Sequence, residues 1–260
     1  VERRRRRARN APTGGCVLRP IWTSTILRAM LTSHRRPLSC EAAWPQDWTQ
    51  NVDVISHRGY WKTPDEKNGE LSFERSFGAG FGTETDLRDR NGTLVISHDP
   101  ATGEAISAER MLEIHQAHDP KLTLALNIKA DGLQGMLGSV LHRFEPADYF
   151  VFDMSIPDTL QWMKHGVPFF TRQSEVEPSP ALYAQAAGVW LDGFDSEWWD
   201  IDVIRRHVDA GKRVCIVSPD LHKRDHRPEW DRLASNDFIQ ESRQVILCTD
   251  FPEEARKLFK

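Results

Sequence analysis

Cysteine is scarce in this chain, and the four that it has, Cys16, Cys40, Cys215 and Cys248, are widely separated. Their number and spacing do not support a disulfide scaffold or a zinc site. Cys215 and Cys248 lie within apolar runs, which predicts buried free thiols. Free thiols favour a reducing compartment, so we expect a cytoplasmic location.

Long apolar runs are missing as well. No stretch approaches the roughly 20 consecutive apolar residues that a membrane span requires, so stable membrane insertion is not expected. The formal net charge is only −4 over 260 residues, which gives no reason to expect a nucleic-acid partner. The oligomeric state has no signature in the sequence.

Acidic residues are absent between Glu2 and Glu41, while arginines are frequent there, with an unbroken run over residues 3–7. An organellar transit peptide has this kind of composition. We favour instead a disordered tail, or upstream sequence translated in error ahead of a start at Met30. Residues 1–50 are therefore predicted to be a basic extension, and residues 51–260 the folded domain.

Short apolar runs alternate with helical patterns from residue 51 onward. Strands are expected at residues 52–56, 82–87, 122–128, 149–152, 168–171, 188–191, 213–217 and 244–248. Helices are expected at residues 73–80, 108–118, 133–144, 157–165, 181–187, 201–210, 229–234 and 252–259. Eight such repeats predict an α/β protein with a (β/α)8 TIM barrel. An open doubly wound sheet is the alternative, but no Gly-rich dinucleotide-binding turn follows the first strand.

The second strand continues into a predicted hairpin. Asn91-Gly92 is a strong signal for a two-residue turn. If Arg90 pairs with Thr93, the returning strand brings His98 back beside the second strand. The barrel therefore carries a β-hairpin excursion at this point.

Function in such barrels lies where the strands reach their carboxyl ends. The polar residues expected there are His57, Arg58, Glu84, Asp86, Asn127, Lys129, Asp153, Arg172, Asp192, Ser218 and Asp250. Asp250 precedes the helix that Pro252 opens, so we expect it to serve only as a helix cap.

Glu84 and Asp86 are two apart on a strand, so their side chains point to the same face. Surface charges are the ordinary interpretation of such a pair. On a barrel strand that faces inward, two unpaired carboxylates repel and are costly to bury, and a bound cation removes that cost. Oxygen ligands favour Mg²⁺ or Ca²⁺ over zinc.

The basic groups near this pair suit phosphate chemistry. His57 and His98 can act as a general acid and base near neutral pH. The guanidinium of Arg58 can bind a phosphate, Lys129 can offset transition-state charge, and Arg172 is expected to be a second anion contact. The remaining histidines, such as His115, His118, His222 and His226, are assigned to the surface.

The motifs that carry these residues resemble those of the glycerophosphodiester phosphodiesterase family. They are Ser56-His57-Arg58-Gly59, Lys67-Asn68, residues 82–88, residues 92–99 and Cys248-Thr249-Asp250-Phe251-Pro252. The resemblance covers nearly everything after residue 51, and the family shares its barrel superfamily with phosphatidylinositol-specific phospholipase C. It implies a metal-dependent phosphodiesterase acting on small phosphodiesters. A neighbouring hydroxyl would attack first, giving a cyclic phosphate that water opens.

The resemblance also assigns roles by matched position. His57 and His98 would be the acid/base pair, Glu84 and Asp86 metal ligands, and Arg58 and Lys129 phosphate contacts. The family's third strand usually reads E-x-K, where this chain has Asn127-Ile128-Lys129. By this match Asn127 would be a third metal ligand. Its amide oxygen brings no charge, so we expect weaker metal binding than in the family.

Three functions therefore stay open: a hydrolase, a lyase or phospholipase D-like member that stops at the cyclic phosphate, and a barrel that binds a phosphorylated ligand without turnover. The leaving group is also open. An aromatic wall for it could come from Trp61, Trp190, Trp198 and Trp199, of which we expect at least half to be core residues.

Overall fold

The computed structural model describes residues 52–259, so the predicted basic extension at residues 1–50 lies outside the described part. The strands are β1 (Asp53–His57), β2 (Gly82–Arg90), β3 (Thr93–Ile96), β4 (Leu124–Ile128), β5 (Tyr149–Phe152), β6 (Phe170–Gln173), β7 (Gly188–Leu191), β8 (Arg213–Val217) and β9 (Val245–Thr249). The α-helices are α1 (Glu70–Gly78), α2 (Ala108–His118), α3 (Gln134–Phe144), α4 (Ile156–Lys164), α5 (Ile201–Asp209), α6 (Arg227–Ala234), α7 (Asp237–Gln240) and α8 (Pro252–Leu258). Short 3-10 helices lie at Pro64–Glu66 and Pro219–His222.

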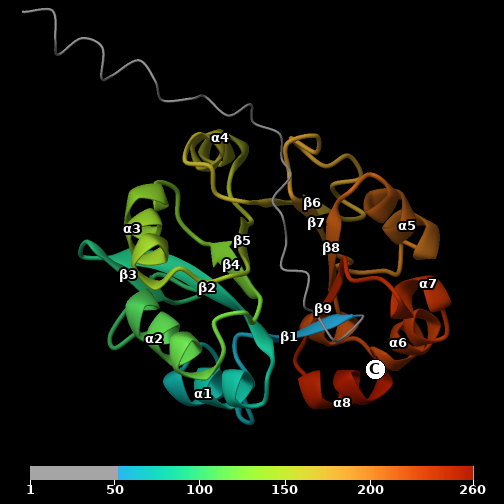
Figure 1. Ribbon diagram of the computed structural model, residues 1–260, viewed down its shortest axis with the longest axis horizontal. Coiled ribbons are helices and arrows are strands. Elements are labelled where there is room, and N and C mark those ends of the chain that lie inside the picture. Colours follow the sequence, from blue (N-terminus) through green and yellow to red (C-terminus); the bar gives the residue numbers. More distant parts are fainter. Residues whose placement is uncertain (1–51, 260) are drawn as a thin grey trace, which may run out of the picture. The chain divides into compact units, whose positions relative to one another are not determined.

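The strands form one sheet in the order β5-β4-β2-β1-β9-β8-β7-β6, with every neighbouring pair parallel. An isolated bridge between Val151 and Phe169 joins β5 to β6, the two ends of that order. The helices surround the strands (Figure 1). The (β/α)8 barrel predicted from the sequence is confirmed.

Alternation of side chains along each strand divides the core into an inside and an outside. Inside the barrel lie residues such as Ile55, Ala125, Phe150, Trp190 and Cys248. Outward-facing residues of the same strands pack against the helices in two further clusters. Cys215 and Cys248 are buried free thiols, as predicted.

The hairpin also agrees with the sequence. Strand β3 runs antiparallel to β2, and Arg90 pairs with Thr93. Asn91 and Gly92 have φ values of 50° and 79°. Two consecutive positive φ angles define the turn whose twist matches that of the strands it joins.

One predicted helix is wrong. Residues 181–185 form turns, and no helix stands between β6 and β7. Leu182 has a φ of 54°, which interrupts a right-handed helix. The Ala187 backbone N–H donates to the Phe169 carbonyl at 2.9 Å, whereas in a helix it would donate to the Tyr183 carbonyl.

A polar cluster closes the amino-terminal end of the barrel. Arg213 donates to both carboxylate oxygens of Asp148, at 2.7 and 3.0 Å. The Thr123 hydroxyl lies 2.6 Å from Asp148 and 2.5 Å from Asp53. This buried, hydrogen-bonded ion pair lies opposite the carboxyl ends of the strands, so we assign it a structural role.

None of the helices in the described part of the chain is both long and apolar enough to cross a membrane.

Candidate functional site

The predicted carboxylate pair lies at the carboxyl end of β2 and faces the barrel interior. In the parallel register Glu84 stands beside His57 on one side and Ala125 on the other, and Ala125 belongs to the interior cluster. Asp86 stands beside Asn127. Glu84 is 2% exposed and Asp86 is 0% exposed, so the surface-charge interpretation does not hold.

Three buried oxygens of this group accept no hydrogen bond from the described residues: Glu84 Oε2, Asp86 Oδ1 and Asn127 Oδ1. The Asn127 amide nitrogen instead donates to the other Glu84 oxygen, at 3.3 Å. Burial and the neighbouring Asp86 carboxylate raise the pKa of Glu84 to about 8. Unsatisfied buried oxygens are costly, and here they belong to residues from two adjacent strands.

These donors suit a hard divalent cation, which takes carboxylate and amide oxygens. In the described residues no three His, Cys, Asp or Glu side chains are grouped as a metal site. The candidate set consists of two carboxylates and one amide, so it brings less charge than three carboxylates would. Glu84, Asp86 and Asn127 are the residues that would hold such a cation.

Asp86 is held from several directions. Arg58 Nε lies 3.0 Å from Oδ2, Lys129 Nζ lies 3.4 Å from Oδ1, and the Asn68 amide donates to Oδ2 at 2.8 Å. Arg58 follows β1 with a φ of 59°, which turns the chain sharply at the strand end. A side chain on Gly59 would collide with Ser72, at 2.3 Å, so glycine is required for that exit.

His57 is oriented by a carboxylate that we expected to be only a helix cap. Its Nδ1 lies 2.7 Å from Asp250 Oδ1, and its Nε2 lies 3.9 Å from Glu84 Oε2. The cap residue of α8 is Phe251, without a side-chain cap bond, so the predicted cap role of Asp250 is wrong. Burial lowers the pKa of His57, and the Asp250 hydrogen bond opposes that shift. Trp61 also donates to Asp250 Oδ1, at 3.2 Å.

His98 lies at the same end of the barrel but is more exposed. The preceding Ser97 donates its backbone N–H to the Asp86 carbonyl at 2.9 Å, which holds this segment against β2. The His98 side chain is 46% exposed, and its Nδ1 lies 3.0 Å from Asp99 Oδ1. Among the described residues it makes no hydrogen bond or ion pair with His57, Glu84 or Asp86.

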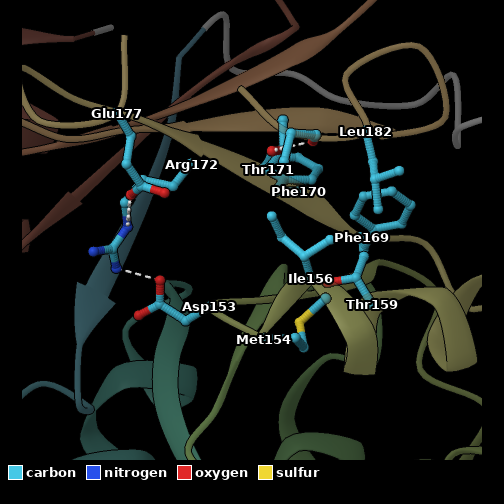
Figure 2. A pocket seen from close by; sticks show the side chains of 11 residues that line it. Asp153, Met154, Ile156, Thr159, Phe169, Phe170, Thr171, Arg172, Glu177 and Leu182 are labelled. Carbon is cyan, nitrogen blue, oxygen red and sulfur yellow. Dashed lines mark hydrogen bonds and ion pairs between the residues drawn. The ribbon is translucent and has the colours of Figure 1, made fainter. Parts of the chain in front are cut away.

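Arg172 connects to the site through a bridging carboxylate. Asp153, directly after β5, forms an ion pair with Arg172 of β6 (Figure 2). Its other oxygen lies 3.8 Å from Lys129 Nζ. The Arg172 guanidinium also lies 5.3 Å from the Phe194 ring centre. Lys129 and Arg172 are therefore held on two sides of one anion, Asp153.

Sequence reasoning missed several partners of these residues. Asn68 was noticed only as part of a motif, and the pairing of His222 with Asp192, at 2.7 Å, was not anticipated. His115 and His226 are buried and His222 is partly buried, so their assignment to the surface is wrong. The position of Asp192 after β7 predicted that it lies at the carboxyl end of the barrel. No sequence pattern near Asp192 indicated which histidine would pair with it.

The four tryptophans divide as expected. Trp190 and Trp199 are buried in the barrel interior and the outer core. Trp198 donates to the Asp192 carbonyl at 2.6 Å, and Trp61 lies beside Asp250. Only the last two remain near the carboxyl ends of the strands.

Together the fold and these contacts define a (β/α)8 barrel with a buried, oxygen-lined acidic pocket between basic groups at its carboxyl end. No family model and no curated protein sequence matches the chain. Solved structures do resemble it. A phosphodiesterase from Oleispira antarctica, in complex with the product sn-glycerol-3-phosphate, has 14% identity and a TM-score of 0.58, over 80% of this chain and 96% of that one.

Two further structures show the same similarity. A glycerophosphodiester phosphodiesterase from Agrobacterium tumefaciens has 15% identity and a TM-score of 0.58, over 80% of this chain and 98% of that one. A Ca²⁺-dependent phosphatidylinositol-specific phospholipase C from Streptomyces antibioticus has 11% identity and a TM-score of 0.50, over 81% and 96%. At these identities the similarity establishes a common fold. The first of these two groups of enzymes is the family that the sequence motifs resemble, and the second is the group expected to share its barrel.

Proposed function

We propose that this protein is a divalent-cation-dependent phosphodiesterase that acts on small phosphodiesters of the glycerophosphodiester type. The observation that carries the proposal is the set of three unsatisfied buried oxygens, on Glu84, Asp86 and Asn127. The solved structures of similar fold include phosphodiesterases, one of them with a glycerol phosphate product, which supports the reaction class.

Each flanking group has a role in this proposal. Arg58 and Lys129 would bind the nonbridging phosphate oxygens, with Arg172 as a further anion contact. A bound Mg²⁺ or Ca²⁺ would supply charge stabilisation for the phosphoryl oxygens. The burial of Glu84 and Asp86 at this end of the barrel strengthens their electrostatic interactions.

His57 and His98 would move the protons. One ring accepts the proton of the substrate hydroxyl next to the phosphate, whose oxygen then bonds to phosphorus. The other ring donates a proton to the departing alkoxide, so the products are a cyclic phosphate and an alcohol. In the second step the rings exchange roles: water adds to phosphorus, the ring opens, and a phosphomonoester results.

The test is hydrolysis of glycerophosphoethanolamine and glycerophosphoinositol by the full chain, with Mg²⁺, with Ca²⁺ and with a chelator. We expect cation-dependent release of glycerol phosphate, and a loss of at least about 100-fold in His57→Ala and in His98→Ala. His118→Ala is the matched control, because His118 is on α2, paired with Glu74. Activity that ignores the chelator, or full activity in His98→Ala, would contradict the proposal.

Cation binding can be measured without turnover. A cation at 100 times its dissociation constant should raise the free energy of unfolding by about 2.7 kcal/mol. Glu84→Gln should abolish that increase. Thermal unfolding with and without Mg²⁺ or Ca²⁺ provides the measurement, and an equal increase in the variant would remove Glu84 from the site.

A phosphate-binding barrel without turnover is the second candidate, because Asp86 is already paired with Arg58 and Lys129 and Asn127 adds no charge. Calorimetry that shows phosphate-ester binding with no product would favour it. Phosphorus NMR tests the third possibility, a lyase or phospholipase D-like enzyme, since a cyclic phosphate that persists means that the water step does not occur.

We also propose a cytoplasmic location, supported by the buried free thiols Cys215 and Cys248.

A further inference from the structure

The barrel has a weak seam between β5 and β6. Every other pair of neighbouring strands is joined by a ladder of at least three residue pairs, whereas this pair has the single bridge of Val151 and Phe169. The hydrogen bond from Val151 N to Pro168 O, at 3.0 Å, is part of that bridge. Because no helix follows β6, the loop between β6 and β7 covers this seam.

A pocket of about 220 Å³ occupies the seam near the carboxyl ends of these strands. Its two ends differ (Figure 2). Mainly apolar side chains, with Thr159 and Thr171 among them, line one end, and Asp153, Arg172 and Glu177 line the other. The apolar lining residues include Met154, Ile156, Phe169, Phe170 and Leu182.

The charged end of this pocket belongs to the candidate site. Asp153 pairs with Arg172 and lies 3.8 Å from Lys129, which in turn lies 3.4 Å from Asp86. Arg172 Nε is buried and makes no hydrogen bond with the described residues, although Glu177 Oε2 lies 3.9 Å from it. A phosphate bound at Lys129 therefore lies next to the entrance of a pocket whose far end is apolar.

We propose that this pocket binds an unbranched alkyl substituent of the phosphodiester, so that the enzyme prefers substrates in which one alcohol is an alkyl chain. This inference rests on the proposed function, and names the substrate group for that site. Arg172 would direct the phosphate end and the apolar residues would receive the chain. A wholly polar alcohol would leave that apolar surface unmatched.

The volume limits the size of the group. Complete ligand pockets usually measure about 300–1,000 Å³, so a cavity of about 220 Å³ fits one short substituent. At its edge the Ile156 side chain is 56% exposed, and Leu160 on the next turn of α4 is 44% exposed. Longer chains would continue over this helix with a smaller gain for each methylene.

A second pocket lies beside Asp250 but is less suited to an alkyl chain. It measures about 390 Å³ and is lined by Tyr60, Trp61 and Phe251, together with Lys62, Glu253, Glu254 and Lys257. With Asp250, five charged side chains of both signs would have to be desolvated by an apolar group there, which is costly. The seam pocket is therefore favoured.

The test uses the full chain and a series of glycerophosphoalkanols with methyl, ethyl, butyl and hexyl groups. Each buried methylene should raise kcat/KM about fourfold, so butyl should exceed ethyl by about 15-fold. The double variant Met154→Gln/Ile156→Gln makes the apolar end polar at nearly constant volume. In this variant the ratio of butyl to ethyl should fall to about 4 or less.

Leu160→Gln is the matched control, because Leu160 is exposed on the same helix but does not line the pocket. It should keep the wild-type ratio of butyl to ethyl. If the double variant fails to fold, judged by circular dichroism, Ile156→Gln alone gives the same test at an exposed position. Its ratio should fall by about half or more.

Calorimetry with methyl phosphate and butyl phosphate measures the pocket without turnover. Tighter binding of the butyl ester in the wild type and in Leu160→Gln, but not in the double variant, would support the inference. Hydrolysis that does not depend on chain length would overturn it and leave the proposed function intact. Failure to hydrolyse any ester, with chain-length-dependent binding retained, would overturn the proposed function and leave the pocket assigned.

Discussion

Asp250 offers the sharpest test of how His57 is positioned. Its Oδ1 lies 2.7 Å from His57 Nδ1, so the ring is held with Nδ1 toward Asp250 and Nε2 toward the pocket. An N–H on Nδ1 then leaves Nε2 as the atom that exchanges protons with substrate. Asp250→Asn keeps the shape but removes the charge, and its amide can donate to Nδ1 and reverse the tautomer.

The magnitude follows from the type of hydrogen bond. A hydrogen bond to a charged partner contributes about 1.5–3 kcal/mol, so loss of its charge should lower kcat by about 10- to 100-fold. The fold should survive, because the hydrogen bond from the Asp250 backbone to Asp220, at 2.8 Å, does not involve the side chain that changes. KM should change by less than about threefold, since Asp250 lies behind the ring relative to the pocket.

The assay is steady-state hydrolysis of a glycerophosphodiester at saturating cation, with nitrogen-15 NMR of the His57 ring as a structural readout. Trp61→Phe is the control, because Trp61 donates to the same Asp250 oxygen at 3.2 Å without touching the His57 bond. A kcat within twofold of wild type in Asp250→Asn, or an equal loss in Trp61→Phe, would refute the positioning role. An unchanged tautomer in the NMR spectrum would do the same.

Three further changes test other parts of the structure. Asn127→Glu adds a third carboxylate beside Glu84 and should tighten Mg²⁺ or Ca²⁺ binding about tenfold by calorimetry. Without cation the variant should have a lower melting temperature. Weaker cation binding would contradict the ligand set. Burial raises the pKa of Glu229 to about 8, so the folded state holds a proton that the unfolded state loses near pH 4.5. Stability should therefore fall between pH 4.5 and 8, by up to about 5 kcal/mol, and urea titrations of Glu229→Gln should show that this fall disappears. Arg213→Met leaves the buried Asp148 carboxylate without its ion pair and should cost about 3–5 kcal/mol in the same titrations, whereas a loss below 1 kcal/mol would show that the pair is dispensable.

Local patterns in the sequence were sufficient for most of the architecture. Alternating apolar runs and helical patterns predicted the barrel, because each β/α unit is specified by contacts close along the chain. Asn91-Gly92 predicted the hairpin and its register, since only residues that tolerate positive φ suit that turn. The predicted helix at residues 181–187 failed where the Ala187 N–H donates to Phe169, outside the segment, instead of to the carbonyl one helical turn earlier.

The candidate site also has some features that the sequence predicts and others that only the structure shows. That Glu84 and Asp86 share a face follows from the period of a strand and needed only the sequence. That they are buried, and that Asn127 stands beside Asp86, follows from the closure of the barrel. Asp250 was mistaken for a helix cap because its partner His57 is 193 positions away along the chain.

By itself, then, the sequence determined the repeating units, the turn and the facing of the acidic pair, all of which depend on φ/ψ preferences and side-chain periodicity within a few residues. Only the tertiary structure decided which charges meet at the barrel end, how Asp153 joins Lys129 to Arg172, and that β5 and β6 leave a pocket between them. Those features depend on how a closed sheet brings together strands that are far apart in the chain. No local sequence pattern specifies which of these distant residues come into contact.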